Sequence, residues 1–169
     1  KCIYCPIEKG IPKSYLSGEP AVERAKKLNY DPYLQVQKRI ESLKKQGHPT
    51  DKIELRIIGG TWSYYPTDYQ NWFIKKCFQA ANEFEKKEKI EVQNLENLQK
   101  INEKAKSRIV GISIETRPDF INEKEILRLR KLGITMVELG IQTIFDDILE
   151  KCFRGHGKKE TILATKLLK

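Results

Sequence analysis

The chain has 169 residues, of which 39% are hydrophobic and 33% charged, a composition typical of one globular domain with a well-solvated surface. No run approaches the roughly 18 apolar residues of a membrane-spanning helix, and no secretory leader is visible, so the composition argues against a membrane protein. The 32 Lys and Arg against 23 Asp and Glu give a net charge of +9, and four cysteines without a regular framework indicate a reducing compartment, hence the cytoplasm.

The positive charge is concentrated toward the beginning of the chain. Residues 1–50 contain 10 basic and 5 acidic side chains, so this stretch carries more than half of the net excess. Such a surface attracts a polyanion mainly through backbone charges and with little regard to sequence. The charge therefore favours a nucleic acid as partner, and an ordinary solvated basic surface is the alternative. The candidate contacts are Lys26, Lys27, Lys38 and Arg39.

A Cys-x-x-Cys pair, Cys2 and Cys5, lies at the beginning of the chain and is followed by a proline. Two thiolates at this spacing can bind one metal ion or iron–sulfur cluster, but a complete site needs further ligands. Cys77 and Cys152 are isolated and each precedes a phenylalanine, as expected of buried thiols, so we expect the missing ligand upstream of Lys1. A zinc knuckle, a disulfide and a thioredoxin-like redox pair are alternatives. The redox pair fits poorly, because it needs the N-terminus of a helix where this chain has a proline and a loop.

Two helices are predicted between residues 18 and 47. Pro20 suits a first helical turn and Gly47 a C-terminal stop. The segment Asn29–Pro32 should divide the region into two helices, because the residue before a proline avoids helical backbone. The predicted apolar face of the second helix comprises Leu34, Ile40 and Leu43.

Strands alternate with helices over the rest of the chain. The predicted strands are residues 52–58, 109–116 and 136–143. The predicted helices are residues 67–106, interrupted near 83–89, and then 122–132, 145–151 and 158–169. This alternation is typical of βαβ units with a parallel sheet and right-handed crossovers. The sequence therefore predicts an α/β fold.

Each predicted strand has one apolar face and one small or polar face. In the second strand, Val110, Ile112 and Ile114 share one face, and Ser113 and Glu115 share the opposite one. Parallel strands covered on both faces are usually hydrophobic throughout. A polar face therefore predicts a partial barrel whose interior holds a ligand, and a sheet with one bare face is the alternative. Barrels of this type keep their chemistry at the C-terminal strand ends, which here carry Thr61, Glu115, Gln142 and Thr143.

Several short motifs point together to one enzyme family. In chain order they are Cys2-Ile-Tyr-Cys5, Gly18-Glu-Pro-Ala, Asn29-Tyr-Asp-Pro-Tyr-Leu-Gln35, Gly47-His-Pro, Asp51-Lys-Ile-Glu-Leu, Gly59-Gly-Thr, Ile114-Glu-Thr-Arg-Pro-Asp119, Val137-Glu-Leu-Gly-Ile-Gln142 and Arg154-Gly-His156. The Cys-x-x-Cys pair, the strand ending in Gly-Gly-Thr and the polar strand ends resemble radical SAM enzymes. The ordered set resembles the catalytic subunit of Elongator, which modifies the wobble uridine of tRNA. The resemblance implies a partial TIM-like (β/α) barrel with parallel strands and outer helices.

The resemblance also implies roles for individual residues. Cys2 and Cys5 match two of the three cysteines that hold a 4Fe-4S cluster, whose fourth iron binds S-adenosylmethionine. Lys52 matches a lysine associated with acetyl-CoA, whose phosphates suit a basic group. The positions that match contacts to S-adenosylmethionine or lie near the nucleoside are Tyr4, Gly59, Gly60, Thr61, Glu115 and Gln142.

The family chemistry implied by the resemblance joins acetyl-CoA to tRNA. An adenosyl radical takes a hydrogen from the acetyl methyl group, the carbon radical adds to C5 of the wobble uridine, and hydrolysis of the thioester leaves a carboxymethyl group. The expected partners are tRNA and either other Elongator-type subunits or a second copy of the chain. Residues 1–169 are expected to form an incomplete radical SAM domain, inactive alone, because the family places its first cluster cysteine upstream and the remaining strands and an acetyltransferase domain downstream.

A non-catalytic RNA-binding module is the alternative function. In that hypothesis Cys2 and Cys5 hold zinc structurally, and the basic surface binds RNA without any need for the Gly-Gly-Thr loop or the polar strand ends. Metal analysis separates the two hypotheses, since one zinc without iron or sulfide favours the binding module.

Overall fold

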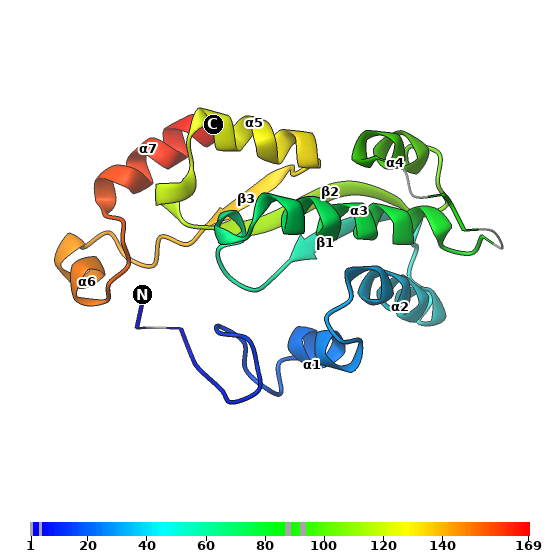
Figure 1. The fold of residues 1–169 in the computed structure, drawn as a ribbon, viewed down its shortest axis with the longest axis horizontal. Coiled ribbons are helices and arrows are strands. Elements are labelled where there is room, and N and C mark those ends of the chain that lie inside the picture. Colours follow the sequence, from blue (N-terminus) through cyan, green and yellow to red (C-terminus); the bar gives the residue numbers. More distant parts are fainter. Residues whose placement is uncertain (1, 4, 87–88, 92–93) are drawn as a thin grey trace.

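The computed structural model describes residues 2–3, 5–86, 89–91 and 94–169 (Figure 1). None of its helices, within those residues, is long and apolar enough to cross a membrane. The elements in chain order are α1 (Pro20–Lys27), α2 (Pro32–Lys45), β1 (Lys52–Ile57), the short helix η1 (Trp62–Tyr64), α3 (Thr67–Glu83), α4 (Leu95–Asn102), β2 (Arg108–Thr116), the short helix η2 (Pro118–Phe120), α5 (Glu123–Leu132), β3 (Met136–Leu139), α6 (Asp146–Lys151) and α7 (Lys158–Leu168).

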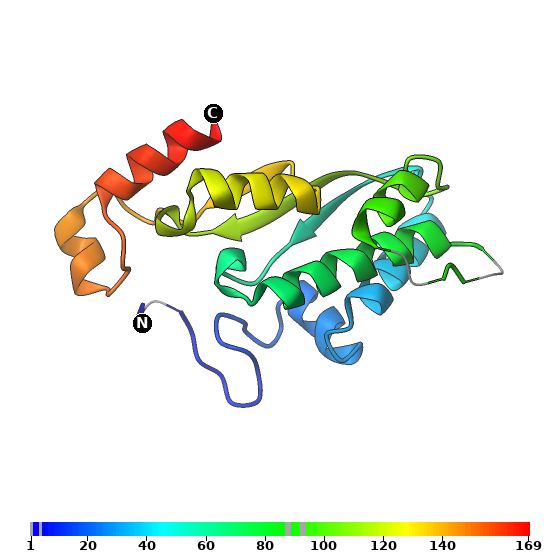
Figure 2. The ribbon, with the colours of Figure 1, turned by 45° about the horizontal axis from the view of Figure 1, so that its top comes forward.

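The three described strands form one parallel sheet in the order β1-β2-β3. This confirms the α/β fold expected from the alternation of strands and helices. The strand arrowheads point toward the side of the molecule that holds α6 and the N-terminus (Figures 1 and 2). The C-terminal strand ends, where polar residues were predicted to gather, therefore lie beside the N-terminal segment.

The hydrophobic core lies on the outer face of the sheet, under α3, α4, α5 and α7. Ile112 and Ile114 of β2 and Ile74 of α3 are almost completely buried within it. They pack with Leu98 of α4 and Leu129 of α5. The apolar face of β2 is thus covered by helices, as expected for a parallel strand.

The predicted break between the first two helices is confirmed. Asn29 and Tyr30 have left-handed backbone, and Asp31 caps α2 by accepting a hydrogen bond from Leu34 N at 2.8 Å. The predicted apolar face of α2 is wrong at Leu34, whose side chain is 43% exposed. The stripe that packs toward α3 comprises Pro32, Val36 and Ile40, which are spaced one helical turn apart.

Two strand details differ from strict alternation. Ile53 pairs with Ile109 but Glu54 pairs with Gly111, so Val110 is an extra residue in β2. This bulge turns Val110 outward, 54% exposed, and corrects its predicted place on the apolar face. The third strand also ends at Leu139 rather than at residue 143. Beyond it the backbone folds into tight turns, in which Ile141 N donates to Leu139 O and Thr143 N to Ile141 O.

A buried pair of asparagines joins α3 and α4 to the start of β2. Asn102 Nδ2 donates to Asn82 Oδ1 at 2.7 Å and to Ser107 O at 3.2 Å, and Asn102 Oδ1 accepts from Ile109 N at 2.7 Å. Asn82 Nδ2 in turn donates to Leu98 O at 2.8 Å. Buried hydrogen bonds of the two amide groups therefore hold α4 against α3 and against the start of β2.

Replacing Asn102 by alanine is expected to lower the free energy of unfolding by about 3 kcal/mol, because it leaves the Ile109 N–H and the Asn82 amide buried without this partner. Urea unfolding of the protein measures the change. The control is Lys100→Ala on the same helix, which removes an exposed pair with Glu96 and should cost less than about 0.5 kcal/mol. Equal effects of the two substitutions would contradict a structural role for the asparagine pair.

Candidate functional site

A cavity of about 610 Å³ lies at the C-terminal ends of the three strands. We call it the strand-end cavity. Its walls come from the N-terminal segment, α1, the loop after β1, the ends of β2 and β3, and the loop after α6. Its lining includes Cys5, Ser14, Tyr15, Gly59, Gly60, Thr61, Glu115, Thr116, Arg117, Gly140, Gln142 and Arg154.

The strand-end cavity brings together most of the residues singled out from the sequence. Cys5, the Gly59–Thr61 loop, Glu115 and Gln142 all line it, although they are far apart in the chain. Cys2 lies beside it, since Arg154, which lines the cavity, donates from Nη1 to Cys2 Sγ at 3.5 Å. Tyr4 lies outside the described residues. Which ligand these residues bind stays a prediction.

Lys52 is the exception among the predicted ligand contacts. It begins β1, whereas the cavity lies beyond the last residue of that strand. At about 3.3 Å per residue, the strand separates the two places by roughly 20 Å. Lys52 is exposed at this opposite end of the sheet, so the structure does not bring it to the strand-end cavity.

The Gly-Gly-Thr loop owes its shape to its two glycines. Gly59 and Gly60 have φ values of 141° and 106°, a region that residues with a Cβ rarely adopt. A Cβ at Gly59 would come within 2.6 Å of Tyr15 Cε1 and Cζ, and even closer to the Tyr15 hydroxyl oxygen. Tyr15 also stacks on Tyr30, and burial raises the pKa of its hydroxyl to about 12. The glycine loop thus packs closely against the N-terminal segment.

The inner face of the sheet is polar, as predicted. Glu138 of β3 accepts a hydrogen bond from Ser113 Oγ of β2 and from Arg56 Nη2 of β1, each at 2.8 Å. Glu115 lies on the same face, and burial together with the carboxylate of Glu138 raises its pKa, while Arg56 and the backbone of Gly60 act in the opposite direction. Glu115 lines the strand-end cavity, and the other residues give the rest of this face hydrogen-bonding groups instead of packed side chains.

Two polar groups of the cavity have no hydrogen-bond partner among the described residues. They are Thr116 Oγ1 and Arg154 Nε, both buried. Buried polar groups are almost always paired in folded proteins, so these two are hydrogen-bonding groups beside the cavity that the described residues leave unused. The sequence did not single out Thr116, although it is the last residue of β2. Arg154 was noted only as part of the motif Arg154-Gly-His156, to which the sequence analysis assigned no role.

Positive charge surrounds the Cys2 thiol. Arg154 is only 8% exposed and is held by a second hydrogen bond, from Nη2 to Gly140 O at 2.7 Å. Arg117 pairs with Asp119, and this pairing, with a smaller contribution from Cys2, raises the pKa of its guanidinium group. Two guanidinium groups beside the thiol suit the anionic thiolates of an iron–sulfur cluster. The described residues contain no group of three or more potential ligands that could hold a metal ion, so a cluster bound at Cys2 and Cys5 needs at least one further ligand.

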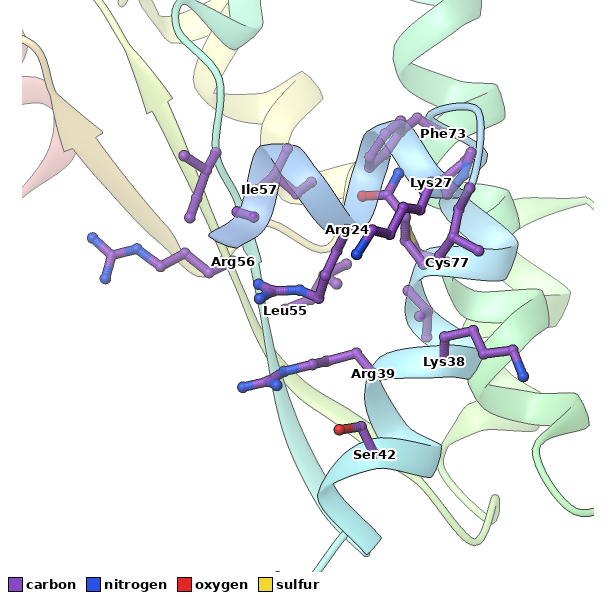
Figure 3. Close-up of a pocket in the computed structure, with 16 residues that line it drawn as sticks. Arg24, Lys27, Lys38, Arg39, Ser42, Leu55, Arg56, Ile57, Phe73 and Cys77 are labelled. Carbon is purple, nitrogen blue, oxygen red and sulfur yellow. The ribbon is translucent and has the colours of Figure 1, made fainter. Parts of the chain in front are cut away.

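A second pocket, of about 370 Å³, lies between α1, α2 and the edge of β1 that pairs with none of the described strands (Figure 3). We call it the basic pocket, because its lining includes Arg24, Lys27, Lys38, Arg39 and Arg56. It collects three of the four basic residues predicted to bind nucleic acid.

Lys26 is not among the residues that line the basic pocket. It lies near Glu8, whose pKa is lowered mainly by the hydrogen bonds from Ser17 and further by the charge of Lys26. The expected common surface of four basic residues is therefore divided between two sides of α1, because consecutive helical residues point in different directions.

Comparison with known proteins identifies a family and several similar proteins. The model of the radical SAM superfamily matches residues 1–169. A protein of Methanocaldococcus infernus named tRNA uridine(34) acetyltransferase is 53% identical over 174 residues, which cover 100% of this chain and 32% of the relative. Human Elongator complex protein 3 is 34% identical, over 94% of this chain and 29% of its own length.

A solved structure agrees with the fold. It is described as the archaeal Methanocaldococcus infernus Elp3 with an N-terminal deletion of residues 1–46, and it matches with a TM-score of 0.74 and 54% sequence identity. The match covers 83% of this chain and 32% of that one. The chain thus spans about a third of the length of the relatives that it resembles.

Proposed function

Because the chain belongs to the radical SAM superfamily, we propose that it forms part of the radical SAM domain of an enzyme that modifies the wobble uridine of tRNA. The relatives named tRNA uridine(34) acetyltransferase support this proposal, since they are 53% and 52% identical over the whole chain. The observation that carries it is the strand-end cavity, where Cys5, the glycine loop, Glu115 and Gln142 meet. Residues 1–169 are proposed to be one incomplete domain of that enzyme.

In this proposal Cys2 and Cys5 hold a 4Fe-4S cluster together with a cysteine outside the chain. The Gly59–Thr61 loop, Glu115 and Gln142 bind S-adenosylmethionine, with Tyr4 beside its adenine as the resemblance implies. When bound, the cluster supplies the electron that cleaves S-adenosylmethionine to a 5′-deoxyadenosyl radical. Arg154 is held beside this site by hydrogen bonds to Cys2 Sγ and Gly140 O. A ligand can approach the backbone of Gly60 closely, because no side chain projects there, whereas Tyr15 covers Gly59.

The second substrate in this proposal is acetyl-CoA, and the product carries a carboxymethyl group at C5 of uridine. Support comes from the resemblance and from the word acetyltransferase in the relatives' names. Lys52 keeps its proposed role toward coenzyme A only if the nucleotide portion of that substrate lies at the far end of β1, roughly 20 Å from the strand-end cavity. The partners proposed are tRNA and further Elongator-type subunits or a second copy of the chain, in the cytoplasm.

The experiment that tests the proposal is anaerobic reconstitution of the full-length protein with iron and sulfide. Mössbauer and ultraviolet-visible spectra should show a 4Fe-4S cluster, and reduction in the presence of S-adenosylmethionine should release 5′-deoxyadenosine. A protein that takes up no iron, or that forms no 5′-deoxyadenosine, would show the proposal to be wrong. One structural zinc in the aerobically purified protein, with no capacity for iron and sulfide, would establish the RNA-binding module instead.

Replacing Glu115 by leucine is expected to weaken S-adenosylmethionine binding about tenfold, while the fold stays intact. Glu115 faces the cavity, so its loss removes a polar partner of a buried ligand rather than a packing contact. Calorimetric titration of the full-length variant measures the affinity. The matched control is Glu54→Leu, on the same face but at the other end of the sheet, away from the cavity. Unchanged affinity of the Glu115 variant, or its failure to fold, would make Glu115 a structural residue.

A further inference from the structure

Two short motifs without a catalytic role so far meet beside Cys2. One is Arg117-Pro-Asp119, directly after β2, and the other is Arg154-Gly-His156, between α6 and α7. Figures 1 and 2 both show α6 and the loop after it next to the N-terminal segment. Three parts of the chain that are far apart in sequence thus converge on the segment that carries the first thiol.

Arg154 joins the N-terminal segment to the end of β3 through the two ends of one guanidinium group. Its Nη1 donates to Cys2 Sγ at 3.5 Å, and its Nη2 donates to Gly140 O at 2.7 Å. The side chain is buried. A planar guanidinium group that is fixed at one end presents its remaining N–H groups in a fixed direction. Arg154 therefore ties the sulfur of Cys2 to the carboxyl end of the sheet.

The pair of Arg117 and Asp119 supports the loop that carries Arg154. Arg117 Nε donates to Asp119 Oδ1 at 2.8 Å, and Asp119 Oδ1 lies 3.6 Å from Nδ1 of the buried His156. Gly155 has a φ of 78°, and a Cβ at this residue would lie 3.0 Å from Arg117 Nη2. The two loops are therefore in close contact, which fixes the direction in which Arg154 leaves its loop.

The two guanidinium groups near Cys2 differ in how their charge is balanced. Arg117 forms an ion pair with Asp119, so a carboxylate neutralises much of its charge at short range. Arg154 instead donates to a sulfur atom and to a neutral carbonyl group. A buried charge acts strongly on its neighbours, and hydrogen bonds to the sulfur atoms help to set the reduction potential of an iron–sulfur cluster. Arg154 is therefore the residue with the stronger influence on a cluster bound at Cys2.

We propose that Arg154 positions Cys2 and, through its hydrogen bond to Cys2 Sγ, raises the reduction potential of the cluster that Cys2 helps to hold. Reduction transfers one electron from an external one-electron donor, and the buried guanidinium group stabilises the added negative charge. Arg117, Asp119 and His156 are positioning residues that hold the loop of Arg154 in place. This inference rests on the proposed function, which supplies the cluster.

The test compares the reduction potential of the reconstituted full-length wild type with that of Arg154→Met. A dye-mediated redox titration is followed by electron paramagnetic resonance, without S-adenosylmethionine, so that turnover does not enter the result. Methionine keeps a long side chain but has neither the charge nor the N–H donors. At one fixed applied potential, the ratio of reduced to oxidised cluster should be about tenfold lower in the variant, which is a shift of about 59 mV for a one-electron couple.

Three further variants separate the position of the charge from its presence. Gly155→Ala keeps Arg154 but strains its loop and presses on Arg117, so the ratio should fall in the same direction. Arg154→Lys keeps the charge but not the fork of donors, so its potential should lie between those of the wild type and Arg154→Met. The control Arg130→Met removes one charge from an exposed position of α5 and should leave the potential unchanged. Thermal unfolding checks that each variant folds.

The positioning role is tested in the full-length protein without a cluster. Ile3 N donates to Cys152 O at 3.2 Å, next to the contact between Cys2 and Arg154. If Arg154 holds this segment, the Ile3 amide should exchange its hydrogen about tenfold faster in Arg154→Met than in the wild type. Mass spectrometry of the peptide that contains Ile3 measures the rate.

Several outcomes would overturn the inference. An unchanged potential in Arg154→Met removes Arg154 from control of the cluster, and unchanged exchange at Ile3 removes its positioning role. A potential of Arg154→Lys equal to that of the wild type would show that the charge alone acts, without the two-ended contact. The proposed function fails separately, if the wild type takes up no iron and sulfide, because the exchange measurement needs no cluster.

Discussion

Replacing Cys5 by alanine is expected to abolish formation of 5′-deoxyadenosine in the reconstituted full-length protein. Cys5 lines the strand-end cavity, and loss of a thiolate from a cluster held by three cysteines leaves too few ligands to retain it. Iron and sulfide analysis should show most of the cluster lost, and rapid-quench chromatography should show product at the level of the uncatalysed background. The effect is therefore at least a hundredfold, the largest that we expect from one substitution.

The matched control is Cys152→Ala. Cys152 is buried, and the structure does not place it among the residues that line the cavity. Its backbone carbonyl accepts a hydrogen bond from Ile3 N, which alanine preserves. The control should retain the cluster and its turnover. A Cys5→Ala variant with full iron content would contradict the proposed ligand role.

Replacing Gly59 by alanine is expected to disrupt both the glycine loop and the binding of S-adenosylmethionine. The added Cβ collides with the ring of Tyr15 and must also adopt a backbone conformation that residues with a Cβ rarely have. We expect the free energy of unfolding to fall by about 2–3 kcal/mol and the ligand affinity by more than tenfold. Thermal unfolding and calorimetric titration measure the two effects.

The double variant Gly59→Ala/Tyr15→Ala separates collision from backbone strain. If the collision dominates, the double variant should lose less free energy of unfolding than the two single variants lose together. If strain dominates, the effects should add. A Gly59→Ala variant as stable as the wild type would mean that the loop rearranges freely. The packing of the glycine loop against Tyr15 would then contribute neither to stability nor to ligand binding.

The features predicted well from the sequence depend on local signals. The break at Asn29–Pro32 follows from one proline and its neighbours, and the polar inner face follows from a period of two in β2. The ordered motifs identified the family because each keeps its place along nearly the whole chain, and the comparisons confirm that resemblance.

The features that the sequence did not predict depend on partners far away in the chain. The bulge at Val110 is defined by pairing with β1, which no pattern within β2 encodes. Tyr15 and Arg154 reach the strand-end cavity from loops whose sequence shows no periodicity. The ligand-contact role of Lys52 came from a motif match, and only the fold places it at the opposite end of the sheet from the other candidates.

The contacts of Cys2 have a consequence for the order of events during folding. The segment that carries both thiols is in contact with Arg154 and with the carbonyl of Cys152, both far away in the sequence. Contacts between residues so distant in sequence form late, since closing a long loop costs entropy before any contact compensates it. The contacts of Cys2 therefore form only after α6 and the loop that follows it have folded. A cluster held by Cys2 and Cys5, as proposed above, would assemble on a segment whose position depends on Arg154, 152 residues away in the sequence.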